Sequence, residues 1–229
     1  EAQMRSGFGV YIRDLLSIGR EAYYLEPADP RYTGELLRGP IDPGGFLCYT
    51  PWAANYKVIS NCQTILSSAD ADAGAKGFAQ TVNAYCLMRV LNLTDTNGAR
   101  LNYDGDITAA VATKAEVLAE IESLLDAGLS NLSSAGSAFS FTLSSGFDGF
   151  NTPSTFSHFN RGLRARAAVH QDDWSTAQTA LTACADWMNS ADGDVGVYHV
   201  FSSGANDFDN AMYEAPDAAT LKLMVHPTF

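Results

Sequence analysis

The sequence predicts an all-α fold, in which antiparallel helix pairs of the tetratricopeptide type carry long loops and at most a few short strands. Residues 156–188 give the strongest indication, because large apolar residues recur there three or four apart on two successive segments. Between the segments lies a polar corner, where Asp172 or Asp173 can cap the second helix. Alanines on both segments allow close approach of the two backbones. Such a pair cannot cover its own apolar face and needs neighbouring helices.

The N-terminal part combines two helical patterns with a long irregular segment. Residues 4–18 have the apolar periodicity of a helix. In residues 19–50, repeated prolines and glycines exclude a long regular element, so we expect a long inserted loop. Ordered loops of this length are often functional. Pro51 suits the first turn of a helix, which we expect to extend to about Ser67.

Two more helices are predicted in the middle of the chain. The apolar stripe of residues 75–93 indicates the first, and a turn-forming sequence with Gly98 follows it. Residues 99–112 have no regular pattern. Thr113 and Glu116 have the spacing of a capping box, in which each side chain satisfies a free backbone N–H of the other residue. The second helix is therefore predicted to begin there.

The remaining segments are predicted to be mostly loop around the helix pair. Residues 139–143 (FSFTL) have the composition of a short strand or an extended segment, and residues 197–201 (VYHVF) that of a short strand. Near the C-terminus, residues 221–225 are expected to pack against the rest of the chain. We expect residues 1–229 to form a single helical domain.

Charge and cysteine spacing exclude several classes of protein. The formal net charge is −12, which argues against nucleic-acid binding and against a basic helix on a membrane surface. No run of ~18 apolar residues is present, so we expect no membrane span. The four cysteines lack the CxxC spacing of zinc sites. Cys62 and Cys86 lie on helices expected to be adjacent, and they either form a disulfide or remain buried thiols.

No motif in the sequence indicates catalysis. The patterns GxGxxG, GxxxxGK[ST], HExxH and GxSxG are all missing. The acidic pairs Asp172/Asp173 and Asp192/Asp194 lie where helix caps and turns need aspartate, and neither has the spacing of an EF-hand loop. We therefore expect no enzymatic activity, no cofactor and no bound metal.

Aromatic residues and arginines are concentrated around the predicted long loop. Aromatic rings stack on the apolar faces of sugars, and arginine donates paired hydrogen bonds to hydroxyl or carboxylate groups. The same rings could instead fix the loop to the helices. The residues concerned are Arg20, Tyr23, Tyr24, Arg31, Tyr32, Arg38, Tyr49 and Trp52. Asn92 and Asn131 each begin an N-x-[ST] tripeptide, a possible glycosylation acceptor.

Four segments resemble, in order and spacing, the SusD/RagB family of bacterial outer-membrane glycan-binding lipoproteins. Residues 51–66 (PWAANYKVISNCQTIL) are similar to that family's Trp-x-x-x-Tyr helix, and residues 75–93 to its next helix. Residues 113–132 resemble its third helix. Residues 159–181 (FNRGLRARAAVHQDDWSTAQTAL) match its repeat-like segment, with Trp174 where the family usually has Tyr. The resemblance covers the N-terminal half of the family.

This resemblance implies a tetratricopeptide-like protein that captures oligosaccharide at the cell surface without catalysis. It implies delivery of the glycan to a SusC-type TonB-dependent transporter, and no lipid anchor within these residues. In the family, arginine and aromatic contacts often precede the Trp-bearing helix. The candidate glycan-binding residues are therefore Arg20, Tyr23, Tyr24, Arg31, Tyr32 and Trp52.

An alternative is a structural protein that assembles with copies of itself or with a partner. Half of a helical solenoid leaves one apolar end uncovered, and uncovered apolar surfaces associate. The two hypotheses differ in their ligand, which is a sugar in the first and a protein in the second.

Overall fold

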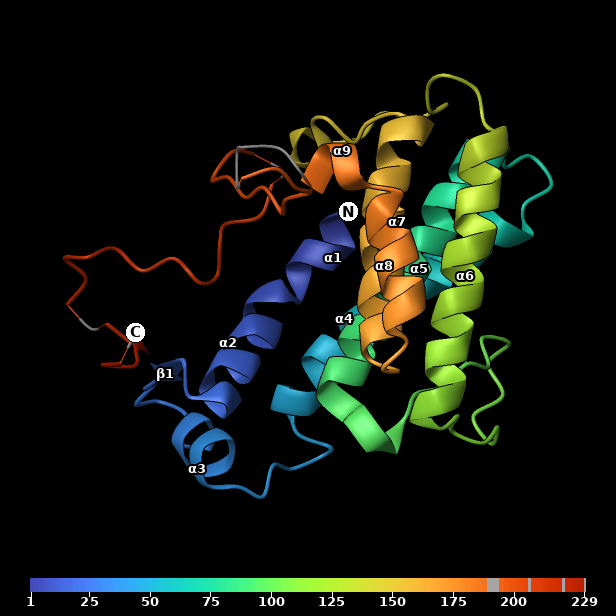
Figure 1. Ribbon diagram of the computed structural model, residues 1–229. Helices are drawn as coiled ribbons and strands as arrows, with labels where there is room; N and C mark the ends of the chain where they lie inside the picture. The colour runs from blue at the N-terminus through green and yellow to red at the C-terminus, as the bar shows by residue number, and fades with distance from the viewer. Residues whose placement is uncertain (189–193, 206, 220, 229) are drawn as a thin grey trace. The chain divides into compact units, whose positions relative to one another are not determined.

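The computed structural model describes residues 1–188, 194–205, 207–219 and 221–228, which are mainly helical (Figure 1). Among these residues, the strands β1 and β2 form one two-stranded antiparallel sheet. The predicted all-α class with few short strands is confirmed. The elements are α1 (Ala2–Ser6), α2 (Phe8–Gly19), β1 (Ala22–Tyr24), α3 (Arg31–Arg38), α4 (Phe46–Ser67), α5 (Ala73–Thr94), η1 (Asp95–Asn97), α6 (Lys114–Ser134), η2 (Ser145–Phe147), α7 (Pro153–Val169), α8 (Trp174–Thr182), α9 (Ala185–Met188) and β2 (Leu223–Val225).

The contacts divide the chain into two compact units. The first comprises Glu1–Tyr56 and Phe201–Phe229, and the second comprises Lys57–Val200. Helix α4 begins in the first unit and ends in the second. The single domain expected from the sequence stays a prediction.

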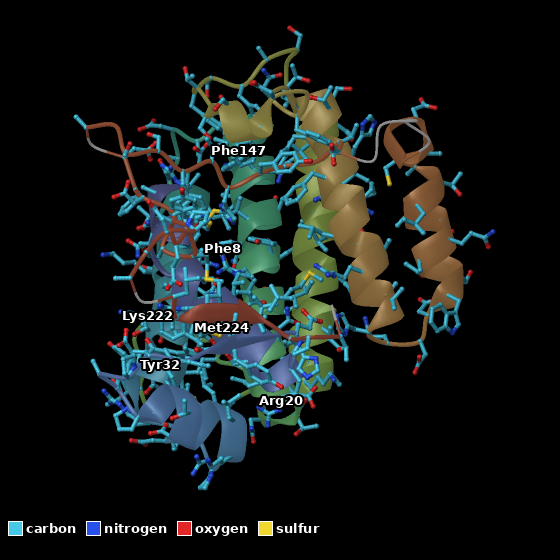
Figure 2. All side chains as sticks on the ribbon, turned by 90° about the vertical axis from the view of Figure 1, so that its left-hand side faces the viewer. Phe8, Arg20, Tyr32, Phe147, Lys222 and Met224 are labelled. Atoms are coloured by element: carbon cyan, nitrogen blue, oxygen red, sulfur yellow. The ribbon has the colours of Figure 1, made fainter. Side chains whose placement is uncertain are left out.

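In the first unit, the C-terminal strand closes onto the N-terminal segment. Strand β2 pairs with β1 in the register Ala22↔Val225, and α2 packs on β1 and on α3. Lys222 Nζ lies 2.5 Å from the Glu26 carboxylate. Figure 2 labels Lys222 and Met224 on the C-terminal segment of this unit. The expected packing of residues 221–225 is confirmed.

The helix predicted over residues 4–18 is interrupted at Gly7. Its backbone there (φ −97°, ψ 0°) separates α1 from α2. A Cβ atom on Gly7 would lie 2.5 Å from Ala54 Cβ, so α4 passes too close to this position for any side chain. The single periodic stripe in the sequence could not show that approach.

The segment predicted as a long irregular loop contains β1 and α3. Helix α3 buries Tyr32 and Leu36, spaced one turn apart, against Leu47 of α4. It ends at Gly39, whose φ of +60° suits glycine. The prolines therefore delimit a short amphipathic helix and do not exclude one.

Helix α4 begins at Phe46, which makes the predicted start at Pro51 wrong. The backbone N–H of Tyr49 already donates to Gly45 O over 2.9 Å, so the helix is under way before the proline. Pro51 cannot donate to the preceding turn. Its own carbonyl accepts a bond of 2.7 Å from Asn55 Nδ2, in addition to the helical pattern.

The second unit is a series of packed helices. Successive helices α5, α6, α7 and α8 pack on one another in chain order, and α5 also contacts α7 (Figure 1). Close approach of α5 and α6 depends on glycine: a Cβ on Gly77 would lie 2.9 Å from Gly128 O. The predicted packing of the helix pair over residues 156–188 is confirmed for α7 and α8.

A buried amide ties three of these helices together. Asn160 on α7 donates from Nδ2 to Thr81 Oγ1 on α5 at 2.8 Å and to Leu125 O on α6 at 3.0 Å. Its Oδ1 accepts from Arg161 Nε at 2.8 Å, and Arg161 in turn donates to Asp126. Every polar atom of the Asn160 side chain is thus engaged, as burial requires.

The predicted caps of α6 and α8 are present, whereas Thr152 and not Ser154 caps α7. Thr113 and Glu116 form the reciprocal capping box of α6. Of the two candidates for capping α8, Asp173 accepts the bond, from the backbone N–H of Thr176 at 3.0 Å. Asp192, of the second acidic pair, lies outside the described residues.

Neither predicted short strand forms. Phe139 and Leu143 of the first segment, and Val197 of the second, pack against the cluster of Leu132, Phe147, Phe150 and Phe156. Alternating apolar residues indicate a strand only if a partner strand is available. Here the loops place their apolar side chains directly onto helix ends. The second helix of the predicted pair, expected to continue to Met188, ends instead at Thr182, and α9 begins at Ala185. Between them, the backbone N–H of Cys184 donates to Leu181 O.

Candidate functional site

Two of the candidate tyrosines are packing residues. Tyr32 is only 8% exposed and belongs to the cluster with Leu36 and Leu47. The ring of Tyr24 meets Tyr32 edge-on at 4.6 Å, and the Arg13 guanidinium lies 4.6 Å from its centroid. Burial raises the pKa of the Tyr32 hydroxyl. Stacking on a sugar needs an accessible ring face, which Tyr32 offers little of, so glycan binding by Tyr32 stays a prediction.

Two candidate arginines are held by neighbours in the same unit. Arg31 forms two hydrogen bonds to Asp29, at 2.9 and 2.7 Å, and its guanidinium lies 4.4 Å from the Phe46 ring centroid. Arg20, in a left-handed conformation (φ +62°), donates to Leu37 O at 2.6 Å and to Ser17 O at 3.2 Å. Both remain exposed, but these bonds fix the positions of their side chains.

Tyr23 and Trp52 are half-buried and lie on different elements. The Tyr23 ring, on β1, is 5.5 Å from the His226 ring, with a tilt of 56°. The Trp52 ring, on α4, is 4.4 Å from Tyr56. The candidates come from β1, α3, α4 and the residue after α2, and most of them contact neighbours within the same unit. Tyr24, Tyr32 and Arg31 serve the packing of α3, which is the role the alternative interpretation gave them.

Helix α4 instead presents a row of aromatic rings. Tyr49, Trp52 and Tyr56 are spaced by three and four residues, so they share one face of the helix. Tyr49 is 61% exposed, and the other two are half-buried. We call these three residues the aromatic face of α4. Tyr56 was not among the candidate residues, although its i, i+3, i+7 spacing with Tyr49 and Trp52 could have indicated it from the sequence.

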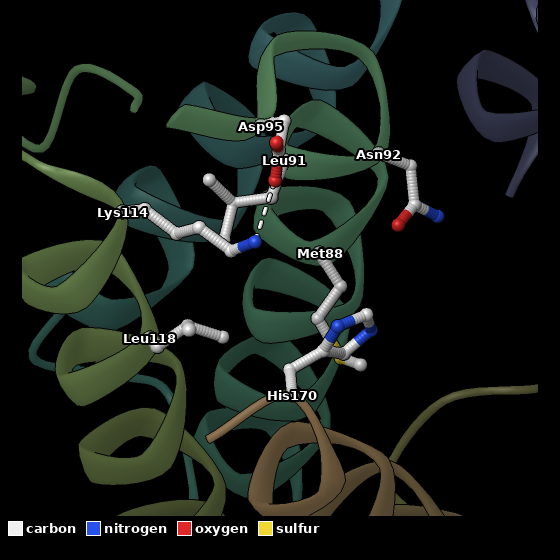
Figure 3. A pocket seen from close by; sticks show the side chains of 7 residues that line it. All are labelled: Met88, Leu91, Asn92, Asp95, Lys114, Leu118 and His170. Atoms are coloured by element: carbon white, nitrogen blue, oxygen red, sulfur yellow. Dashed lines mark hydrogen bonds and ion pairs between the residues drawn. The ribbon is translucent and has the colours of Figure 1, made fainter. Parts of the chain in front are cut away.

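The second unit contains a small pocket where α5 ends and α6 begins (Figure 3). Its volume is about 220 Å³. Met88 and Leu91 from α5, with Leu118 from α6, form an apolar floor. Polar groups on α5, on α6, just after α5 and just after α7 surround this floor: Asn92, Asp95, Lys114 and His170. The sequence gave no sign of this pocket, because the elements that line it meet only after the helices pack.

An ion pair crosses one side of this pocket. Lys114 Nζ lies 2.5 Å from Asp95 Oδ1, as Figure 3 shows. The hydrogen bond from Lys114 lowers the pKa of the Asp95 carboxyl, and His170 acts in the same direction. Asp95 therefore carries a negative charge at neutral pH.

An exposed apolar surface lies on α8. Val169, Trp174 and Leu181 are exposed, Trp174 to 64%, and they line a shallow depression of about 490 Å³. Helix α8 has no charged residue between Trp174 and Thr182. This surface is noteworthy on a chain with a net charge of −12.

The disulfide considered for Cys62 and Cys86 is not formed. Both are buried free thiols, as is Cys184, and Cys48 is a half-buried free thiol. Burial raises the pKa of each of the two thiols to about 12, so neither is a reactive thiolate.

Both tripeptide asparagines lie within helices. Asn92 is exposed on α5 at the rim of the pocket, and Asn131 is half-buried on α6. Asn131 Nδ2 donates to Gln80 Oε1 at 2.8 Å, so the helix packing already uses its amide. Glycosylation of either residue stays a prediction.

Within the described parts of the chain, no group of three or more His, Cys, Asp or Glu side chains is placed to hold a metal ion. No helix formed by those residues combines the length and the apolar character needed to cross a bilayer. Compared with models of known families and with curated proteins, the chain gives no match.

Proposed function

We propose that this chain binds an oligosaccharide without altering it chemically, at the outer-membrane surface of a bacterium, and delivers it to a SusC-type TonB-dependent transporter. The aromatic face of α4 carries the proposal. A row of partly exposed rings on a helix offers stacking surfaces for successive sugar rings, whose faces are apolar and whose edges are polar. The resemblance of residues 51–181 to the SusD/RagB family supports the cellular role.

The geometry changes which residues we assign to the glycan. Tyr49 and Trp52 supply ring faces in place of Tyr24 and Tyr32. Arg20 and Tyr23 stay as secondary candidates, because Arg20 is exposed and its guanidinium has further N–H donors beyond the two in use.

Glycan-array screening of the chain, followed by calorimetric titration of the strongest ligand, tests the binding. Tyr49→Ala removes an exposed ring, and we expect it to weaken binding about tenfold. Trp52→Ala should weaken binding at least as much, with folding checked by circular dichroism. Tyr213→Ala and Trp174→Ala, which remove exposed rings elsewhere, are the matched controls. Binding that both groups of variants weaken equally would contradict the assignment.

Two further measurements test the rest of the proposal. Mass spectrometry of the glycan after incubation should show unchanged ligand, and released products would instead indicate an enzyme. In the source genome, we expect a gene for a TonB-dependent barrel beside the gene for this chain. Its absence would count against delivery to a transporter.

The second candidate function is self-association through the exposed surface of α8. A second copy fits this surface, because an uncharged face lets two molecules of net charge −12 meet with the least repulsion. Sedimentation at increasing concentration tests it. Salt should strengthen the dimer by screening the remaining repulsion. Trp174→Glu should abolish it while Tyr213→Glu leaves it intact, and a monomer at all concentrations would exclude it.

A further inference from the structure

The pocket between α5 and α6 has the properties of a site for a small ligand with an apolar part. Its floor consists of Met88, Leu91 and Leu118, which are only 6%, 7% and 4% exposed, so an occupant would contact the small part of each that faces the pocket. Its volume of about 220 Å³ lies below the ~300 Å³ at which drug-sized sites begin, so the occupant is small. Polar groups occur only around the floor, where they can orient such a ligand.

The charges of the pocket have a fixed polarity. Lys114 is the first residue of α6, so its positive charge adds to the positive end of that helix dipole. Asp95 directly follows α5, so its negative charge adds to the negative end of that helix. The two charges therefore lie next to each other at one side of the pocket, each beside the helix end whose partial charge has the same sign. The two opposite charges lie 2.5 Å apart.

We propose that this pocket binds a free α-amino acid with an apolar side chain, such as leucine or methionine. An amino acid carries an ammonium and a carboxylate about 3 Å apart, fixed by its covalent geometry. Its carboxylate would lie against Lys114 and the start of α6, and its ammonium against Asp95 and the end of α5. The ligand's ammonium and carboxylate then lie beside Asp95 and Lys114, so that each charge of the ligand faces a protein charge of opposite sign.

The remaining groups complete this recognition. The apolar side chain of the amino acid would leave water and lie in van der Waals contact with Met88, Leu91 and Leu118. The Asn92 amide and the His170 ring reach the pocket from α5 and from the end of α7 (Figure 3). The His170 ring can bond to the ligand through an N–H group.

A neutral sugar matches the pocket less well. A sugar binds through hydrogen-bonding groups above an apolar floor. Because it carries no charge, it forms no ion pair with Lys114 or Asp95. In a second alternative, the Lys114–Asp95 ion pair only joins the ends of two helices and no ligand binds. The experiment below distinguishes both alternatives from amino-acid binding.

Calorimetric titration of the full chain with L-leucine and L-methionine, up to about 10 mM, tests the proposal. We expect saturable binding that moves the amide NMR signals of residues 88–95 and 114–118. Leucinamide lacks the carboxylate, N-acetyl-leucine lacks the ammonium, and glycine lacks the side chain. Each should bind at least about tenfold more weakly. No saturable binding, equal binding of leucinamide, or tighter binding of a monosaccharide at these residues would overturn the proposal.

Variants separate recognition from helix stability. Asp95→Asn keeps the size and shape of the side chain at this position of positive φ (+43°) and removes only the charge. Asp95→Asn and Lys114→Gln should each weaken leucine binding about tenfold. Lys57→Gln, which removes an exposed lysine outside the pocket, is the matched control and should bind as the unchanged chain does. Unchanged affinity in both pocket variants, checked for folding by circular dichroism, would show that the ion pair only joins helix ends.

Discussion

At the scale of single residues, one buried carboxyl without hydrogen-bond partners makes the stability of this protein depend on pH. Asp14 on α2 is 3% exposed, and neither of its carboxylate oxygens has a hydrogen-bond partner. Burial raises its pKa to about 7, although the charge of Arg13 acts in the opposite direction. Asn160, by contrast, is equally buried and fully bonded. The two residues show that burial stabilises a polar group only where partners are present.

Asp14→Asn should make the protein more stable at pH 8 and remove the fall of its unfolding free energy between pH 4 and pH 7. The folded state holds the Asp14 proton up to about pH 7, whereas an unfolded aspartate loses it near 3.8. Stability is therefore fully retained below about pH 4 and falls as the pH rises toward 7, by up to ~1.4 kcal/mol per unit. We expect the variant to gain roughly 1–3 kcal/mol at pH 8 and little at pH 4.

Urea denaturation from pH 4 to pH 8 measures this effect. Asp70→Asn, which changes an exposed aspartate in the same way, is the control and should follow the unchanged chain. A variant whose unfolding free energy falls with pH as steeply as that of the unchanged chain would show that Asp14 is not responsible.

At the scale of elements, glycine has opposite effects in two helices. Gly77 on α5 lies against α6, where a Cβ would be 2.8 Å from Leu132 Cγ and 2.9 Å from Gly128 O. Gly34 on α3 is exposed, and a Cβ there would meet nothing within 4 Å. Intrinsic helix propensity favours alanine at both positions. At Gly77, packing decides whether the change to alanine stabilises or destabilises the protein. The backbone atom of α6 that the new methyl would meet can move away only if the whole helix moves.

Gly77→Ala and Gly34→Ala should therefore change stability in opposite directions. We expect Gly77→Ala to lower the free energy of unfolding by about 1–3 kcal/mol, since the added methyl overpacks a helix contact. Gly34→Ala should raise it by about 0.5–1 kcal/mol through the lower entropy of the unfolded chain. Chemical denaturation of both variants measures the difference. Stabilisation by Gly77→Ala would mean that the α5–α6 contact is looser than described.

Local sequence signals predicted the elements whose causes are local. Thr113 and Glu116 lie three residues apart, so their capping box needed no tertiary information. The need for glycine at position 7 depends instead on Ala54, far along the chain. The missing strand at residues 197–201 depends on the absence of a partner strand. Such events depend on packing, which periodicity in one segment does not reveal.

The candidate site shows the same limit more sharply. The sequence correctly showed that rings and arginines gather before and within α4. It could not show that α3 would use Tyr32 in its own core, which left the exposed rings on α4. The amino-acid pocket depends on Asp95, Lys114 and His170, which are separated by up to three helices in the chain. No spacing rule links such residues before the helices pack.

At the scale of the whole molecule, the two compact units differ in how their stability arises. The second unit consists of consecutive helices that contact their neighbours in sequence. The first unit needs a long-range contact, because its N-terminal strand pairs with residues near the C-terminus. Around this pairing, Leu25 N donates to Lys222 O at 2.7 Å and His226 N donates to Glu21 O at 2.9 Å.

Deletion of residues 221–229 should therefore loosen the first unit and leave the helices of the second intact. Without β2, the backbone groups of residues 21–25 lose their partners and the Glu26 carboxylate loses Lys222. Hydrogen exchange followed by mass spectrometry should show faster exchange in residues 20–26, with unchanged protection in α5 and α6. Met224→Ala is the control, because it shortens an exposed side chain and keeps the backbone pairing. Equal loss of protection in both units would show that they unfold as one cooperative structure.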